Sequence, residues 1–183
     1  VLTILGVAIG VAAVVSLMGI GEGARMGVMK QFESLGSNVV KIEAVQESAA
    51  FSPDLAYELM ERVEALDYVT PVAVGKSDLR FRRLRAEVDV FGTNEYFPLI
   101  RDNALESGEF FNTLAVNRSL QVAVLGHNLA ASLYNGRDPV GQVISLGGLE
   151  YNIVGVLAPK GKGQAEDIDD KVVIPYTTAQ RIT

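Results

Sequence analysis

The residues that could perform chemistry are few and scattered. The chain of 183 residues contains one histidine, His127, and no cysteine, so it has neither disulfides nor thiolate metal sites. No serine lies in a G-x-S-x-G motif, the nucleophile elbow of α/β-hydrolases. No partner in the sequence can be assigned to His127. We therefore predict a capping or packing role for this histidine, in preference to a catalytic one.

Two other stretches have the composition of a binding site but not its spacing. Carboxylates gather at Glu166, Asp167, Asp169 and Asp170. They could bind calcium, but their spacing is not that of an EF-hand loop, and we expect a solvated acidic loop. The stretch 161–163 reads Gly-Lys-Gly but lacks the full G-x-x-x-x-G-K-[ST] pattern. We expect no P-loop ATP hydrolysis and no cofactor in this chain.

A third motif lies at the end of the apolar N-terminal run. Residues 19–24 match the dinucleotide fingerprint with Ala in the last place, and Glu43 follows at a suitable distance. However, the run before it, residues 1–21, has no charged residue and is far longer than an ordinary strand. As a helix it would be roughly 30 Å long, the thickness of a bilayer's hydrocarbon core. We therefore predict a transmembrane helix rather than a dinucleotide site.

Two more interpretations of this run are weaker. A signal peptide would have a basic start, a shorter apolar core and a small-residue cleavage site. A helix buried in a soluble domain seldom continues this far without a charge. Gly6 and Gly10 form a GxxxG pair, which favours close helix packing in lipid. Because the chain starts without Met inside an apolar run, we expect it to be a fragment of a longer protein.

The pattern changes from apolar to amphipathic after Gly21. Three apolar residues then fall on one helical stripe, and Gly36 supplies a C-terminal cap. We predict that residues 1–36 form one helix, which leaves the membrane and continues into water as a stalk. The stalk residues expected to matter are Arg25, Val28, Met29, Phe32 and Leu35.

The remaining residues predict a mixed α/β structure. Residues 39–75 read as strand, helix and strand, with the helix starting at Ser52. Residues 76–92 read as a hairpin, whose turn at Arg83-Leu84 would place Arg80 opposite Glu87. Further strands are expected at 121–125, 142–146, 150–157 and 171–174, with helices at 127–134 and from 176 onward.

A cluster of arginines in the predicted hairpin allows two interpretations. It could bind nucleic acid, or it could be a solvated hairpin whose charges pair across the strands. The chain has a net charge of −6, which argues against nucleic acid, so we favour the solvated hairpin. The arginines are Arg80, Arg82, Arg83 and Arg85.

Several stretches together resemble the MacB-type ABC transporter permeases of the FtsX/MacB family. The N-terminal run followed by LGSNVV resembles their first transmembrane helix and stalk. Five later pieces, in the same order, resemble their periplasmic core domain. These pieces are SGEFF (107–111), VAVLG (122–126), DPVGQVISLGG (138–148), NIVGVLAPKG (152–161) and VVIPYTTAQR (172–181).

The resemblance implies an α+β fold with a split architecture. Residues 1–36 would be transmembrane helix and stalk, and 37–75 the first half of a mixed α/β subdomain called the porter. Residues 76–176 would form an inserted, β-rich subdomain called the sabre. Residues 177–183 would begin the return to the porter, which would be incomplete here.

The resemblance also implies partners and a mechanism. The permease would lie in the cell inner (plasma) membrane with most of this chain periplasmic, and the ATPase that binds ATP would be a separate domain or subunit. A second permease copy, an adaptor protein and an outer-membrane channel could complete the assembly. ATP-driven movement would pass along the stalk and push substrate outward. The alternative is a membrane-anchored extracytoplasmic interaction or sensor module without transport.

Overall fold

The chain forms two units in a computed structural model, and each is described by itself. The described residues are 6, 10–16, 18–19, 21, 39–43, 52, 54–160 and 168–182. The first unit is Val1–Asn38 and the second is Val39–Thr183. In the first unit, residues 10–16 are helical with exposed side chains. Within the described ranges, no helix combines the length and apolarity that a membrane crossing requires. The predicted transmembrane helix lies partly outside these ranges and the stalk residues lie wholly outside them, so both remain predictions.

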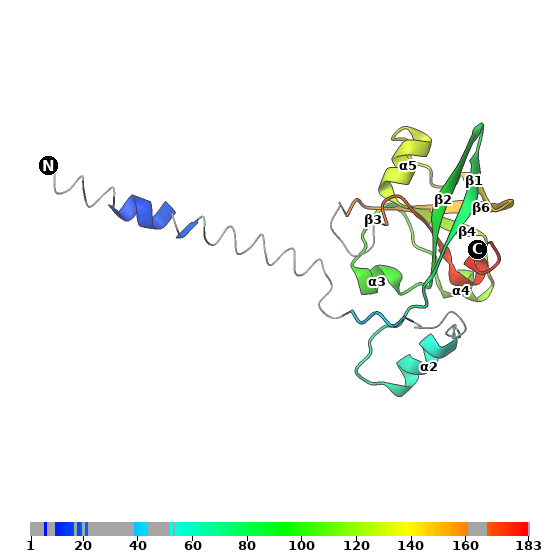
Figure 1. Cartoon of the computed structure of the whole chain (residues 1–183), viewed down its shortest axis with the longest axis horizontal. Helices are drawn as coiled ribbons and strands as arrows, with labels where there is room; N and C mark the ends of the chain where they lie inside the picture. The colour runs from blue at the N-terminus through cyan, green and yellow to red at the C-terminus, as the bar shows by residue number, and fades with distance from the viewer. Residues whose placement is uncertain are drawn as a thin grey trace. The chain divides into compact units, whose positions relative to one another are not determined.

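The second unit alternates strands with short helices (Figure 1). Its strands are β1 (Ala73–Phe81), β2 (Leu84–Thr93), β3 (Leu105–Gly108), β4 (Val122–Leu125), β5 (Val143–Leu146), β6 (Leu149–Leu157) and β7 (Val172–Pro175). Its helices are α2 (Asp54–Arg62), α3 (Phe97–Arg101), α4 (Thr113–Asn117), α5 (His127–Tyr134) and α6 (Tyr176–Ala179).

The strands form one sheet that closes on itself. Their order is β3-β6-β4-β7-β2-β1-β5, and β5 also pairs with β6. The ring is therefore closed by six strands, with β3 outside it alongside β6. Most pairs are antiparallel, but β2 with β7 and β4 with β6 are parallel. Strands close in space are thus far apart in sequence, since Val90 of β2 pairs with Val172 of β7.

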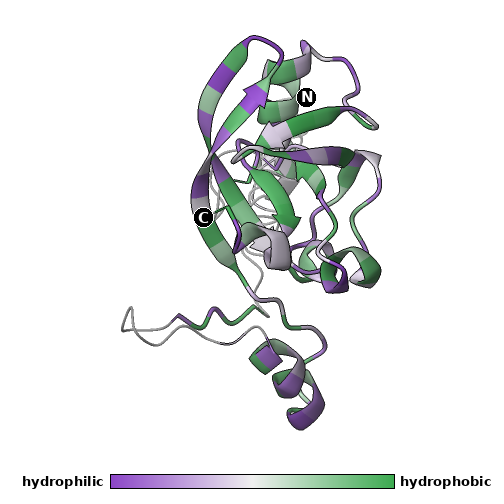
Figure 2. Cartoon of the chain, turned by 90° about the vertical axis from the view of Figure 1, so that its right-hand side faces the viewer, coloured by the Kyte–Doolittle hydropathy of each residue, from purple (hydrophilic) through white to green (hydrophobic). Residues whose placement is uncertain are grey.

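Hydrophobic and hydrophilic residues alternate along the strands of the hairpin (Figure 2). Across the sheet, this alternation produces two separate cores. In β4, Ala123 and Leu125 belong to one core and Val124 to the other. The first core has members from every strand of the ring, so it fills the barrel interior, and α5 and α6 contribute Ala130, Tyr134 and Ala179 to it. The second lies on the outer face, where α3 and α4 pack on the sheet through Phe97, Ala115 and Val116.

The β1–β2 hairpin exists, but the predicted register is wrong. Its turn is at Arg82-Arg83, so Arg80 pairs with Arg85 and Glu87 pairs with Asp78. The error is two residues, which keeps every side chain on its predicted face because strand side chains alternate with a period of two. The prediction was wrong because it placed the opposite charges of Arg80 and Glu87 across from each other. Leu79 and Val88 are buried in the barrel. Both registers would bury them, so the hydrophobic pattern could not distinguish the two registers.

Two other strand predictions also need correction. Residues 39–43 are not a strand, and Val40 and Ile42 are exposed there, because no neighbouring strand pairs with them among the described residues. The second strand expected within residues 39–75 begins only at Ala73 and continues to Phe81, across the predicted boundary between residues 75 and 76. The division into porter-like and sabre-like parts remains a prediction. The helix expected after Ser52 is confirmed as α2 but ends at Arg62.

Candidate functional site

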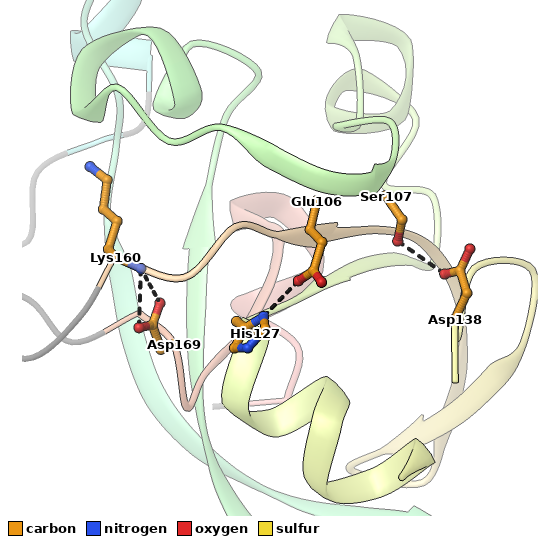
Figure 3. Close-up of polar contacts among 6 residues, drawn as sticks. All are labelled: Glu106, Ser107, His127, Asp138, Lys160 and Asp169. Carbon is orange, nitrogen blue, oxygen red and sulfur yellow. Dashed lines mark hydrogen bonds and ion pairs between the residues drawn. The ribbon is translucent and has the colours of Figure 1, made fainter. Parts of the chain in front are cut away.

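The residues that the sequence singled out for packing and for the stalk are not brought together by the described structure. Gly6 and Gly10 are helical, and a Cβ atom at either position would meet open space. Arg25, Val28, Met29, Phe32 and Leu35 lie outside the described residues. The candidate site that the structure does describe lies in the second unit, around the start of α5 (Figure 3).

His127 has the acidic partner that the sequence could not assign. It is the first residue of α5, and its Nδ1 lies 2.6 Å from Oε2 of Glu106 on β3. Nearby, Ser107 donates its hydroxyl to Asp138 at 3.0 Å, and Asp138 also accepts from the backbone N–H of Val140 (Figure 3). Two side-chain contacts therefore join β3, which lies outside the ring, to α5 and to the turn before β5.

Asp169 holds the N-terminus of α5 through hydrogen bonds. Its side chain is buried, and its carboxylate oxygens accept from the backbone N–H of Lys160 at 3.2 and 3.3 Å. Its backbone carbonyl accepts from the N–H of Leu129, one of the donors that a helix start leaves unpaired. Gly126 donates its N–H to Lys171 at 2.9 Å. The segment before β7 therefore caps α5 with backbone atoms.

Lys160 extends this network to α3. Its ammonium donates to the backbone carbonyl of Arg101, the last residue of α3. Burial lowers the pKa of Lys160 below its usual value, against the opposing effect of the Asp102 carboxylate. A lysine held in this way ties the end of β6 to α3, which is a fastening role.

A second polar cluster joins α2 and the segment after it to the barrel. Asn94 is fully buried, donates its side-chain amide to the carbonyl of Val69 at 3.0 Å, and receives the N–H of Tyr96 at 3.2 Å. The hydroxyls of Thr70 and Thr93 lie 2.7 Å apart. These bonds attach the chain after α2 to the end of β2.

Tyr57 brings α2 itself into this cluster. Burial, and then the Glu95 carboxylate and Tyr176, raise the pKa of Tyr57 to about 12. Glu95 in turn accepts the hydroxyl of Thr113, the first residue of α4, at 2.9 Å. The cluster, here called the α2 joint, therefore contains side chains from α2, α4 and α6 around the end of β2.

These contacts connect secondary-structure elements of the domain. Within the part of the chain that the structure describes, no three His, Cys, Asp or Glu residues lie close enough to hold a metal ion. The His127–Glu106 pair and the Ser107–Asp138 pair each join two elements of the fold. Glu166 and Asp167 of the acidic stretch, and the stretch 161–163, lie outside the described residues.

Comparison with protein families decides what this fold is. The whole chain, residues 1–183, matches the family described as MacB-like periplasmic core domain. The chain belongs to this family. MacB-like relatives include the "Macrolide export ATP-binding/permease protein MacB" of Bordetella avium, 34% identical over 97% of this chain and 28% of the relative. The "Pyoverdine export ATP-binding/permease protein PvdT" of Pseudomonas entomophila is 32% identical over the same share of each. The chain thus spans less than a third of the curated relatives it matches.

Solved structures show the same MacB-like fold. The periplasmic region of MacB from Actinobacillus actinomycetemcomitans has a TM-score of 0.66 at 15% identity, covering 81% of this chain and 70% of that one. The extracellular domain of the transporter YknZ from Gram-positive bacteria has a TM-score of 0.61 at 16% identity, covering 72% and 65%. The resemblance to MacB-type permeases drawn from the sequence is confirmed.

Sequence reasoning missed the residues that hold the MacB-like domain together. Glu106 and Asp138 are isolated acidic residues, and nothing in their neighbourhood marks a partner 21 or 31 positions away. Asn94 gave a local signal, since an Asn before a short helix is typical of a capping position. Its bond to Val69 depends on the barrel's topology and has no sequence signature.

Proposed function

We propose that this chain is the first membrane helix, stalk and periplasmic core of an ABC transporter permease, and that it passes movement from ATP hydrolysis on a partner domain to substrate outside the membrane. The observation that carries the proposal is the family match over residues 1–183. Relatives named as export ATP-binding/permease proteins support it.

A mechanical role needs a body that moves as one piece, and the second unit has the features of one. Its sheet is closed, so each strand of the ring is paired with a neighbour on both sides. The contact of Leu129 with Asp169, that of His127 with Glu106 and that of Asn94 with Val69 each join residues distant in sequence. Interiors packed in this way transmit displacement with little compression. A stalk attached to this body would move it as a whole.

The partners follow from the same proposal. ATP would bind to an ABC ATPase domain or subunit, and this chain would hold no cofactor. A second permease copy, a periplasmic adaptor and an outer-membrane channel would complete the export path. The single N-terminal helix would lie in the inner membrane. The names of the relatives support no single cargo, because chains of similar identity are named for macrolide and for pyoverdine export.

The test breaks the stalk without altering the barrel. Met29→Pro removes a backbone donor and clashes with the preceding helical turn, which costs about 3 kcal/mol or more locally. We expect it to abolish export in the intact permease while ATP hydrolysis continues. Met29→Leu keeps the helix and the volume, and should export normally.

Export and ATPase rate are measured in variants that reach the membrane in equal amounts. Normal export by Met29→Pro would refute the lever and would leave the domain as a tethered docking platform. Loss of export by Met29→Leu as well would show that side-chain chemistry, and not helical continuity, matters at this position.

A further inference from the structure

The tip of the β1–β2 hairpin carries a concentration of charge opposite in sign to that of the chain. Four of the chain's 16 basic residues lie within positions 80–85, although the net charge is −6. All four are exposed. We call this group the arginine tip, and its members are Arg80, Arg82, Arg83 and Arg85.

The hairpin register works against stability at this point. Arg80 is directly opposite Arg85, and like charges in directly opposed positions of an antiparallel pair are destabilising. Arg82 has a φ of 55°, in the left-handed region where Gly or Asn is the ordinary choice. Its guanidinium lies 5.0 Å from the centre of the Phe81 ring. Residues chosen for folding alone would avoid both features.

Among the described residues, no acidic group forms an ion pair with the arginine tip. The ion pair of this hairpin is farther from the tip, between Lys76 and Glu87 at 3.3 Å. The guanidinium groups of Arg80, Arg83 and Arg85 therefore remain available to a partner. Leu84 lies among them with 47% of its surface exposed, which adds an apolar contact to the charged ones.

The tip is also reachable from outside. Strand β7 pairs with β2 only from Val90 to Thr93, so on that side the hairpin end extends beyond its neighbouring strand. On the other side β5 lies beside β1 at Leu79 and Arg80. The end of the hairpin projects at the top of the view (Figure 1).

The charges behind the tip restrict the kind of partner. Asp78 and Glu87 share the outer face with Arg80 and Arg85 and are two residues farther back on each strand, about 7 Å along the hairpin. That is within the screening length of about 8 Å at physiological ionic strength. An anionic bilayer or a long nucleic acid lying along the hairpin would meet these carboxylates. A compact carboxylate cluster that reaches only the tip would not.

We propose that the arginine tip is a docking point for a protein partner that presents a small cluster of carboxylates around an apolar residue. Arginine is enriched at protein interfaces because its planar guanidinium binds carboxylates in a bidentate manner. This proposal does not depend on transport and would hold for any role of the domain.

The test measures binding of a defined acidic probe to the full chain in a neutral detergent. The probe is a fluorescently labelled peptide with four glutamates around one leucine, and the reference peptide has glutamines in their place. Fluorescence anisotropy at low salt should show binding of the glutamate peptide only. Combined Arg80→Gln, Arg83→Gln and Arg85→Gln should weaken it about tenfold, because three exposed ion pairs are lost. Arg82 is kept because it contacts Phe81.

The matched control removes the same charge elsewhere. Combined Arg62→Gln, Arg118→Gln and Arg137→Gln changes exposed residues outside the hairpin, and it should leave the dissociation constant within about twofold. Equal weakening by both triple variants would overturn the proposal, since it would show attraction to overall charge.

Two parallel measurements separate other partners. Vesicles of phosphatidylglycerol and a single-stranded oligonucleotide are titrated against the same variants, and we expect both to bind more weakly than the glutamate peptide. Tighter, tip-dependent binding of either would overturn the protein-partner assignment. Absence of peptide binding by the unmodified chain would also overturn it, and would leave the arginines as charges that guard an open strand edge.

Discussion

Substitution of Gly126 tests how the segment before β7 holds α5. Two physical effects of the change to alanine act on the stability of the domain in opposite directions. The backbone angles of Gly126, φ −66° and ψ 152°, suit any residue. On that ground alone, Gly126→Ala would stabilise the domain by about 0.4–1 kcal/mol through the unfolded chain. However, the new Cβ would lie 2.3 Å from the carbonyl oxygen of Ile168 and 2.4 Å from that of Asp169.

The steric effect should win by a wide margin. Relief of these contacts needs a backbone shift of about 1 Å. The atoms that must move are held by hydrogen bonds from Gly126 to Lys171 at 2.9 Å and from Leu129 to Asp169 at 3.1 Å. Overpacking costs about 1–3 kcal/mol, and each weakened hydrogen bond adds about 1 kcal/mol. We expect Gly126→Ala to lower the free energy of unfolding by about 3 kcal/mol.

Thermal unfolding of the full chain, followed by circular dichroism, measures this change. A loss of this size in a chain of 183 residues should lower Tm by roughly 6–12 °C. Gly136→Ala is the control, because its Cβ would meet open space but its φ of 74° is strained for alanine. It should cost only about 1–2 kcal/mol. An unchanged or raised Tm for Gly126→Ala would refute the close contact between α5 and the segment before β7.

The remaining predictions concern the α2 joint and α4. Because the folded pKa of Tyr57 is about 12, above its ordinary value of 10.0, its stabilising contribution is complete below pH 10 and is lost as the pH rises towards 12. Tyr57→Phe should remove one late-titrating group from the alkaline tyrosinate absorbance curve, and an unchanged curve would contradict the burial of this hydroxyl. Asn112→Ala should cost about 1 kcal/mol in chemical denaturation, since the side chain caps α4 by accepting from the N–H of Ala115 at 3.1 Å. Asn112→Asp keeps the acceptor and should be nearly neutral, whereas equal losses in both variants would argue against the cap.

Local patterns in the sequence predicted the elements whose signals are local. The Gly147-Gly148 turn has positive φ at both positions, as a type I′ hairpin turn requires, and β5 and β6 flank it as expected. Helix α5 ends at Tyr134, as the sequence predicted, and Asn135 follows it in the left-handed conformation. Both features depend on a few adjacent residues.

Features that depend on distant residues could not be predicted. Strand β3 was not among the expected strands, because Leu105–Gly108 is only four residues long and gains its strand character by pairing with β6. Closure of the sheet depends on β5 pairing with β1 as well as with its hairpin partner β6. The α2 joint follows from this topology, so its residues could be recognised as a group only in three dimensions.

The position of β7 in the ring has a consequence for how the domain is made. β7 is the last of the seven strands in the sequence, yet it lies between β4 and β2. As the chain emerges N-terminus first during synthesis, the β1–β2 hairpin and the β5–β6 hairpin can form early, but the barrel cannot close until residues 172–175 are available. About 80 residues separate β2 from the strand that completes it. Joining such distant segments is a slow step. Until then, the inward faces of β2 and β4 are exposed to chaperones, proteases and other unfinished chains.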